Sequence, residues 1–251
     1  MVSRKKSFLE GVFVDLLGTP VTMITGIIIT PVYFKYINSN QYGIWTSALD
    51  YITLLTLMNA GINIQIIQNL SSFKKNKSEV NLSSILLYQI LIILIGTLLS
   101  IIGLYYFPIF NQINESENSR LLIIISLNLI LITGSLNGWF NSVIQGQNRV
   151  GLSNLIDYLS KLSYQMFPVL LMVYGLKLSS FSTAYFFTNI FILITYVCIL
   201  NKFILEIFKK FTINFESLKN NFFFSFKMFI GGISYYILNF TDTLIIANYL
   251  S

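Results

Sequence analysis

Long apolar runs separated by short polar stretches dominate this chain. A helix that crosses a bilayer needs about 20 mostly apolar residues, and seven runs of about that length lie between charged or turn-forming residues. The runs do not alternate with a period of two, as membrane β-strands do. The pattern therefore predicts an all-α, polytopic transmembrane helical bundle. The predicted spans are Val12–Phe34, Ile44–Ile67, Leu82–Phe107, Leu121–Gln145, Leu155–Gly175, Leu178–Leu200 and Phe222–Ala247.

Composition supports a membrane protein and argues against several soluble classes. Hydrophobic residues make up 55% of the 251 residues and charged residues 10%, with a mean hydropathy of +0.71. A soluble domain would need more surface charge. The net charge of +6 does not indicate nucleic acid, because the Lys and Arg residues lie between apolar runs and form no basic patch.

Candidate chemistry for an enzyme is sparse in the sequence. The chain has no histidine, which excludes His-based triads and His-ligated zinc sites. A Gly-rich phosphate loop, a GxSxG motif and a loop with paired DxD carboxylates are also absent from the sequence. We therefore predict that the protein is not an enzyme, and we expect neither a cofactor nor a metal.

Basic residues in the short loops predict the orientation, because they resist translocation. If the amino terminus is cytoplasmic, twelve Lys and Arg residues lie on the cytoplasmic side and three, Lys35, Arg120 and Lys177, lie outside. The opposite orientation would invert this strong bias. The sequence thus predicts a multi-pass protein with a cytoplasmic amino terminus.

Polar residues recur inside four of the spans at helical spacing. One interpretation is helix packing, in which small residues allow close approach and amides bond across the interface. The other is a shared polar interior that lines a transport pathway. The stripes are Asp15, Thr19, Thr22 and Gly26; Thr56, Asn59 and Asn63; Gly134, Gly138, Asn141 and Gln145; and Gly232, Tyr235, Asn239 and Asp242.

The fifth span carries two charges of opposite sign. Asp157 and Lys161 are one helical turn apart and can pair, and Tyr164 and Gln165 continue the same face. The pair is either interfacial, with Lys161 reaching for the membrane surface, or a polar anchor in a substrate pathway. A polytopic protein with a polar interior and short loops is most simply a transporter.

Several short motifs, in their order along the chain, resemble a known family. They are Gln41-Tyr42-Gly43-Ile44-Trp45, Met58-Asn59-Ala60-Gly61-Ile62, Ile144-Gln145-Gly146-Gln147-Asn148-Arg149 and the stretch from Gly231 to Asp242. Together with the predicted topology, they resemble Wzx-type O-antigen and capsule flippases of the multidrug/oligosaccharidyl-lipid/polysaccharide exporter superfamily. The resemblance implies a bacterial inner-membrane protein with two six-helix lobes facing a central cavity. It also implies an undecaprenyl-diphosphate-linked oligosaccharide as substrate.

The resemblance divides the chain and assigns roles. Residues 1–215 would form an amino-terminal lobe, and residues 216–251 the first helix of an incomplete second lobe. Basic cavity residues are typical of the family, and Lys161 is the only match within a span. Expected partners are lipid-linked oligosaccharide, membrane lipids, a coupling cation and other glycan-export proteins, with no nucleic acid. The substrate-binding candidates are Lys161, Asp157, Gln165, Asn59, Asn63, Asn141, Gln145 and Asn239, and the coupling-ion candidates are Asp15 and Asp242.

Three alternatives remain open at this stage. A cation-coupled small-molecule exporter of the same superfamily would use Asp15 as its coupling carboxylate. A membrane glycan polymerase or glycosyltransferase would need a larger outer loop or clustered carboxylates, whereas Glu115 and Glu117 are the only acidic pair in the outer loops. The third alternative is a truncated product without function of its own.

Overall fold

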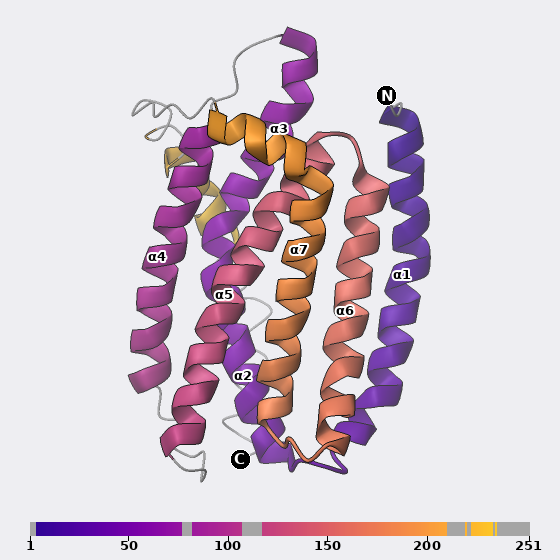
Figure 1. Ribbon diagram of the computed structural model, residues 1–251, viewed down its shortest axis with the longest axis vertical. Coiled ribbons are helices and arrows are strands. Elements are labelled where there is room, and N and C mark those ends of the chain that lie inside the picture. Colours follow the sequence, from indigo (N-terminus) through magenta and orange to yellow (C-terminus); the bar gives the residue numbers. More distant parts are fainter. Residues whose placement is uncertain are drawn as a thin grey trace.

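The computed structural model describes residues 4–76, 82–106, 117–209, 219, 222–232 and 234, and all regular elements in these ranges are helices (Figure 1). The predicted all-α class is therefore confirmed. The elements are α1 (Arg4–Tyr33), α2 (Ser39–Thr56), the 3-10 turn η1 (Leu57–Asn59), α3 (Ala60–Asn76), α4 (Leu82–Tyr106), α5 (Glu117–Gly146), α6 (Val150–Val173), α7 (Ser179–Lys209) and a short helix at Phe222–Gly232.

Four of the described helices are long and apolar enough to cross a membrane. They correspond to the first, third, fourth and sixth predicted spans and cover Lys6–Tyr33, Ser83–Tyr106, Ile123–Gly146 and Ser179–Ile207. Helix α6 occupies the fifth predicted span. The seventh is described from Phe222 to Gly232, and the candidates Asn239 and Asp242 lie outside the described residues. The chain is thus a multi-pass membrane protein.

The second predicted span is not one continuous helix. Helix α2 ends at Thr56, and η1 separates it from α3. Asn59, within the break, is buried, and its side-chain amide donates to Ser135 Oγ at 2.9 Å. Asn and Gly are weak helix formers, and Gly61 follows immediately. The hydrogen bond from Asn59 to Ser135 on α5 stabilises this break. Apolar residues continue through it, so the sequence pattern does not reveal it.

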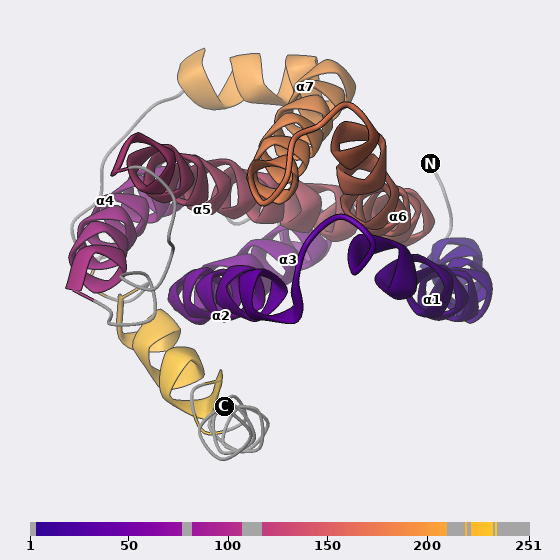
Figure 2. The ribbon, with the colours of Figure 1, turned by 90° about the horizontal axis from the view of Figure 1, so that it is seen from below.

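The helices lie side by side with α5 in the middle of the bundle. Helix α5 contacts α2, α3, α4, α6 and α7, whereas α1 lies at one edge and packs chiefly against α6 (Figure 2). The start of α1, the α5–α6 turn and the end of α7 lie at one end of the bundle. The α1–α2 and α6–α7 connections lie at the other end (Figure 1).

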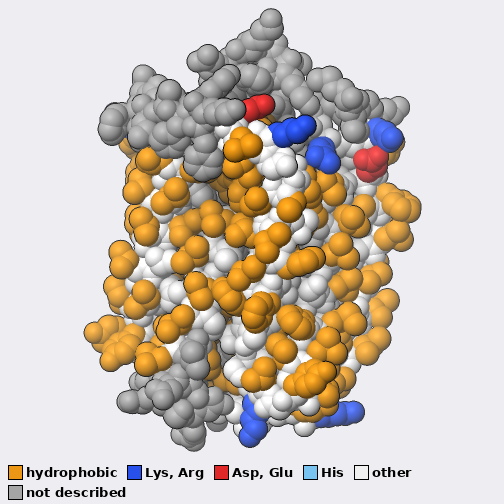
Figure 3. Space-filling model, viewed as in Figure 1, with side chains coloured by type: hydrophobic (Ala, Val, Ile, Leu, Met, Phe, Trp, Pro, Cys, Tyr) orange, Lys and Arg blue, Asp and Glu red, His pale blue; other side chains and the backbone are white. Residues whose placement is uncertain are grey.

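Charged and apolar side chains are distributed as a bilayer requires. Figure 3 shows apolar side chains over the middle of the molecule and Lys or Arg side chains near its two ends. Ile27 on α1, for example, is 74% exposed, as expected for a lipid-facing residue. Which end is cytoplasmic stays a prediction.

Helix α2 starts at a well-defined cap. The Asn38 side chain accepts a hydrogen bond from the Gln41 amide at 2.7 Å, and the Gln41 side chain accepts one from the Asn38 amide at 3.4 Å. This reciprocal capping box fixes where the helix begins. It thereby sets the positions of Tyr42 and Trp45 in the first turns of α2, opposite α7.

Candidate functional site

Helices α1 and α6 meet along a polar seam. Asn154 Nδ2 donates to Asp15 Oδ1 at 2.9 Å, and the hydroxyls of Thr19 and Tyr158 are 2.8 Å apart. Gly18 lies directly under the Tyr158 ring. The first predicted stripe therefore faces α6 and contributes to helix packing. The coupling-ion candidate Asp15 is an exposed member of this seam.

Farther along the seam, α1 and α6 border an open groove of about 700 Å³. Lys161 and Gln165 line it from α6, with Thr22 and Gly26 on α1 opposite. The Gln165 amide donates to the Thr22 carbonyl at 3.3 Å. The groove places a cation and a polar stripe on an otherwise apolar surface.

The predicted pairing of Asp157 with Lys161 is wrong. Within the described part of the chain no ion pair joins them, and Lys161 Nζ instead lies 4.8 Å from the centre of the Tyr158 ring. Asn141 Nδ2 donates to the two Asp157 carboxylate oxygens at 3.1 and 2.9 Å. The two side chains diverge because Asp157 turns towards α5 and Lys161 towards the groove beside α1.

Asp157 belongs to a polar network between α5, α6 and α7. Asn141 accepts a hydrogen bond from Ser153, whose hydroxyl also accepts one from the Gln145 amide at 2.9 Å. The network borders a cavity of about 230 Å³, which Asp157 and Asn141 line together with Asn137, Asn189 and Tyr164. Three predicted candidates, Asp157, Asn141 and Gln145, are thus brought together.

Asn137 and Asn189 line this cavity, although neither was among the candidates from the sequence. Asn137 Nδ2 donates to the carbonyl and to Oδ1 of Asn189 at 3.0 and 3.1 Å, and Tyr164 donates to the same Oδ1 at 3.0 Å. Asn137 Oδ1 is buried and without a described partner. Asn137 lies one turn before Asn141 in the polar stripe of α5, so the stripe itself contained the signal.

Asn59 and Asn63 occupy different places. Asn59 joins the α2–α3 break to α5, as described above, and is a packing residue. Asn63 lies against Gly138, its Nδ2 atom 3.2 Å from where a Cβ of that residue would be. Gly138 also lines the cavity beside Asp157. Asn63 therefore approaches the polar network, whereas Asn59 does not line it.

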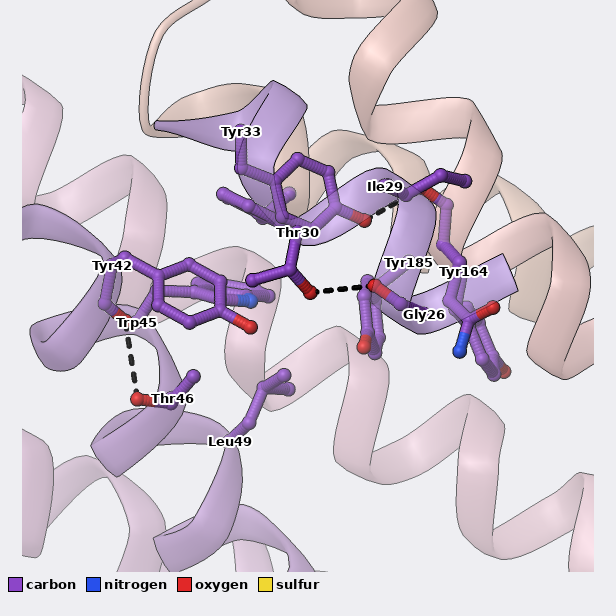
Figure 4. A pocket seen from close by; sticks show the side chains of 12 residues that line it. Gly26, Ile29, Thr30, Tyr33, Tyr42, Trp45, Thr46, Leu49, Tyr164 and Tyr185 are labelled. Carbon is purple, nitrogen blue, oxygen red and sulfur yellow. Dashed lines mark hydrogen bonds between the residues drawn. The ribbon is translucent and has the colours of Figure 1, made fainter. Parts of the chain in front are cut away.

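A further pocket, of about 200 Å³, lies between α1, α2, α6 and α7 (Figure 4). We refer to it as the aromatic chamber. Tyr42 and Trp45 belong to a family-like motif in the sequence, but the residue pattern of no single helix predicts the chamber. Its aromatic side chains are Tyr33, Tyr42, Trp45, Tyr164, Phe181 and Tyr185.

These observations define a class: a polytopic helical membrane protein with a groove, a polar cavity and an aromatic chamber within its bundle. The sequence model of one family, described as "Polysaccharide biosynthesis protein", matches residues 8–251. The chain belongs to this family, which is that of the Wzx-type polysaccharide flippases. No curated protein and no solved structure is significantly similar to the chain.

Proposed function

We propose that the protein transports polyprenyl-diphosphate-linked oligosaccharide across the membrane during polysaccharide export. Family membership supports a general role in polysaccharide export. The observation that carries the finer proposal is Lys161, which lines the groove between α1 and α6 and has no carboxylate within ion-pair distance among the described residues.

A charge in this position calls for an explanation. A lysine near the centre of a membrane helix costs about 2.5–3.5 kcal/mol and generally marks a functional pathway. The Tyr158 ring offsets part of this cost by about 0.5–2 kcal/mol through a cation–π contact. An anionic ligand beside Lys161 would offset the rest of this cost. A diphosphate is suited to the lysine ammonium group, which is a point charge on a flexible stem.

In the proposed mechanism, the groove shelters the polar head of the lipid while its prenyl tail stays in the bilayer. Lys161 attracts the diphosphate, and Gln165 and Thr22 offer polar atoms beside it. Residues 1–215 would act as one lobe, and residues 216–251 would begin a second. Rocking of such units against each other would give alternating access.

Replacement of Lys161 tests the proposal. In proteoliposomes that hold the full chain and a fluorescent polyprenyl-diphosphate oligosaccharide, Lys161→Gln should slow transfer at least about tenfold, the effect of losing about 1.4 kcal/mol. Lys161→Arg should retain most activity because the charge persists. Lys177→Gln, in the exposed α6–α7 connection, is the matched control. Normal transfer by Lys161→Gln would contradict the proposal.

A cation-coupled exporter of small molecules is the second candidate. It is favoured by the Asp157 carboxylate, which lines a polar cavity together with Asn137, whose Oδ1 has no partner among the described residues. Oxygen donors of this kind suit a hard monovalent or divalent cation. Sodium-dependent dye efflux that Asp157→Asn abolishes, with no transfer of lipid-linked glycan, would favour this function over the first.

A further inference from the structure

The aromatic chamber lies beside the groove that holds Lys161. Gly26, Thr30 and Gln165 line both spaces. The chamber lies towards the end of the bundle with the α1–α2 and α6–α7 connections, because Tyr33 ends α1 and Phe181 begins α7. A ligand whose head lies in the groove could therefore extend into the chamber without leaving the protein.

Ring–ring contacts hold the aromatic walls in place. Tyr164 and Tyr185 stack with their centroids 4.3 Å apart, and Trp45 stacks on Phe181 at 5.5 Å. Tyr33 meets Phe181 edge to face at 4.9 Å. Offset and edge-to-face pairs of this kind are each worth about 0.5–1.5 kcal/mol. These contacts hold the rings against one another before any ligand binds.

The rings face the interior of the protein rather than the membrane surface. Aromatic belts of membrane proteins place Trp and Tyr at the lipid headgroups. In contrast, Trp45 and Phe181 are each 2% exposed, and Figure 4 shows the Tyr42 and Tyr185 side chains on opposite sides of one space. An anchoring belt therefore does not account for the chamber.

The chamber also offers unused hydrogen-bonding atoms. Gln165 Oε1 is buried and has no partner among the described residues. The hydroxyls of Tyr42 and Tyr185 likewise make no hydrogen bond to any described residue. The Tyr33 and Thr30 hydroxyls donate to carbonyls at 2.6 and 2.7 Å, which leaves their oxygens free to accept.

The described lining of the chamber carries no charged side chain. Asp50 on α2 lies outside this lining, but it is close enough for its charge to act on Tyr42 and Tyr185, so an anion would meet a carboxylate and no cation of the lining. A hydrocarbon tail would leave Gln165 Oε1 unsatisfied, which costs about as much as a lost hydrogen bond. An uncharged ring with many hydroxyls and apolar C–H faces fits both the rings and the polar atoms. The volume of about 200 Å³ suits one such ring and is smaller than typical drug-sized pockets.

We propose that the aromatic chamber binds one uncharged pyranose ring of the transported glycan. The C–H faces of the sugar pack against Trp45 and Tyr185, and its hydroxyls bond to Gln165 and Tyr42. This inference rests on the proposed function, because it assigns the sugar to the chamber and the diphosphate to the neighbouring groove.

Tryptophan fluorescence tests the chamber directly. The chain has two tryptophans, Trp45 and Trp139, and only Trp45 lines the chamber. In a purified full-length Trp139→Phe variant, titration with the methyl pyranosides of glucose, galactose and N-acetylglucosamine should give a saturable change in Trp45 emission for at least one sugar. Sorbitol, an open-chain polyol, and choline, a cationic probe of aromatic cages, should give none.

Variants locate the binding. Gln165→Leu should weaken sugar binding about fivefold or more, as expected for the loss of one hydrogen bond. Tyr174→Leu, at a residue that is 86% exposed and outside the chamber, should leave it unchanged. If Gln165→Leu loses its helical circular dichroism, Thr46→Val replaces it, because this change removes a hydroxyl that lines the chamber from α2. Saturation-transfer NMR on the unmodified protein gives a measurement free of any substitution.

The outcomes separate this inference from the proposed function. Lys161→Gln should slow transfer of the lipid-linked glycan at least about tenfold and leave monosaccharide binding intact, because Lys161 lines the groove and not the chamber. Sugar binding without any glycan transfer would support the chamber and overturn the transport proposal. Another outcome is a protein that transfers glycan but binds none of the sugars, or one that responds equally to sorbitol or choline. Either result would refute the assignment of a sugar to the chamber and leave the transport proposal standing.

Discussion

Gly18 allows α1 to approach α6, and its replacement tests the seam between them. A Cβ atom at this position would lie 2.5 Å from Cγ and Cδ2 of Tyr158 and 2.7 Å from Cδ1. These are ring atoms close to the α6 backbone, so rotation of a flexible tip cannot relieve the clash. In Gly18→Ala, α1 must therefore move away from α6.

The expected cost has three parts. Overpacking costs about 1–3 kcal/mol. Loss of the bond between Thr19 and Tyr158 adds about 0.6 kcal/mol, the average for hydrogen bonds in membrane bundles. Replacing a helical glycine by alanine returns about 0.5–1 kcal/mol, a gain that Gly43→Ala should show alone, because nothing lies within 4 Å of its new Cβ. Gly18→Ala should thus be less stable than Gly43→Ala by about 1.5–3.5 kcal/mol.

The assay is unfolding of the purified protein by SDS in mixed micelles, followed by far-UV circular dichroism. The same substitution in a Tyr158→Ala background provides the decisive comparison, since removal of the ring leaves room for the new methyl group. There, Gly18→Ala should cost little or even stabilise the protein. An equal loss of stability in both backgrounds would show that the seam is not packed as described.

Two further predictions concern contacts elsewhere in the bundle. A Cβ at Gly61 would lie 2.4 Å from the backbone Cα of Ser225. Gly61→Ala should therefore displace the Phe222–Gly232 helix and speed its proteolysis. Gly231→Ala, with open space around its new Cβ, should not. A double-mutant cycle of Asn141→Ala and Asp157→Ala in the SDS assay should give a coupling energy of about 1.5–3 kcal/mol, as for bonds to charged groups; a value near zero would contradict the paired geometry.

Helix positions followed from the sequence because lipid imposes a simple requirement. A segment surrounded by hydrocarbon must bond all its backbone groups internally and be apolar along its length. Helices α4 and α7 meet this requirement without a charged residue in the membrane, so their runs were unambiguous. The break at Asn59 was missed because apolar residues continue on both sides of it.

Contacts between helices were predictable only in part. The stripe that begins at Asp15 correctly indicated one face of α1, but the partner on α6 was not identifiable from α1 alone. For Asp157 and Lys161, spacing within one helix predicted a pair, whereas the amide of Asn141 on another helix bonds to the carboxylate instead. The pattern along one helix shows in which direction a side chain points, but not which side chain of another helix it meets there.

The aromatic chamber could not be predicted in this way, because four helices each contribute two to four of its residues. Tyrosines near span ends are common in any membrane protein, so their presence in the sequence predicts a belt as readily as a binding site. Their inward orientation depends on the hairpin that Asn38 caps and on the turn before Phe181.

The short 3-10 turn at Leu57–Asn59 has a mechanical consequence for the chamber. Turns of this type within a longer helix often act as hinges. Trp45 lies on α2, on one side of the turn, while the bond from Asn59 to Ser135 holds the turn itself to α5. A change of angle at this turn would move α2, and with it Trp45, away from the other chamber walls. A sugar could then enter or leave while α3 keeps its contacts with α5.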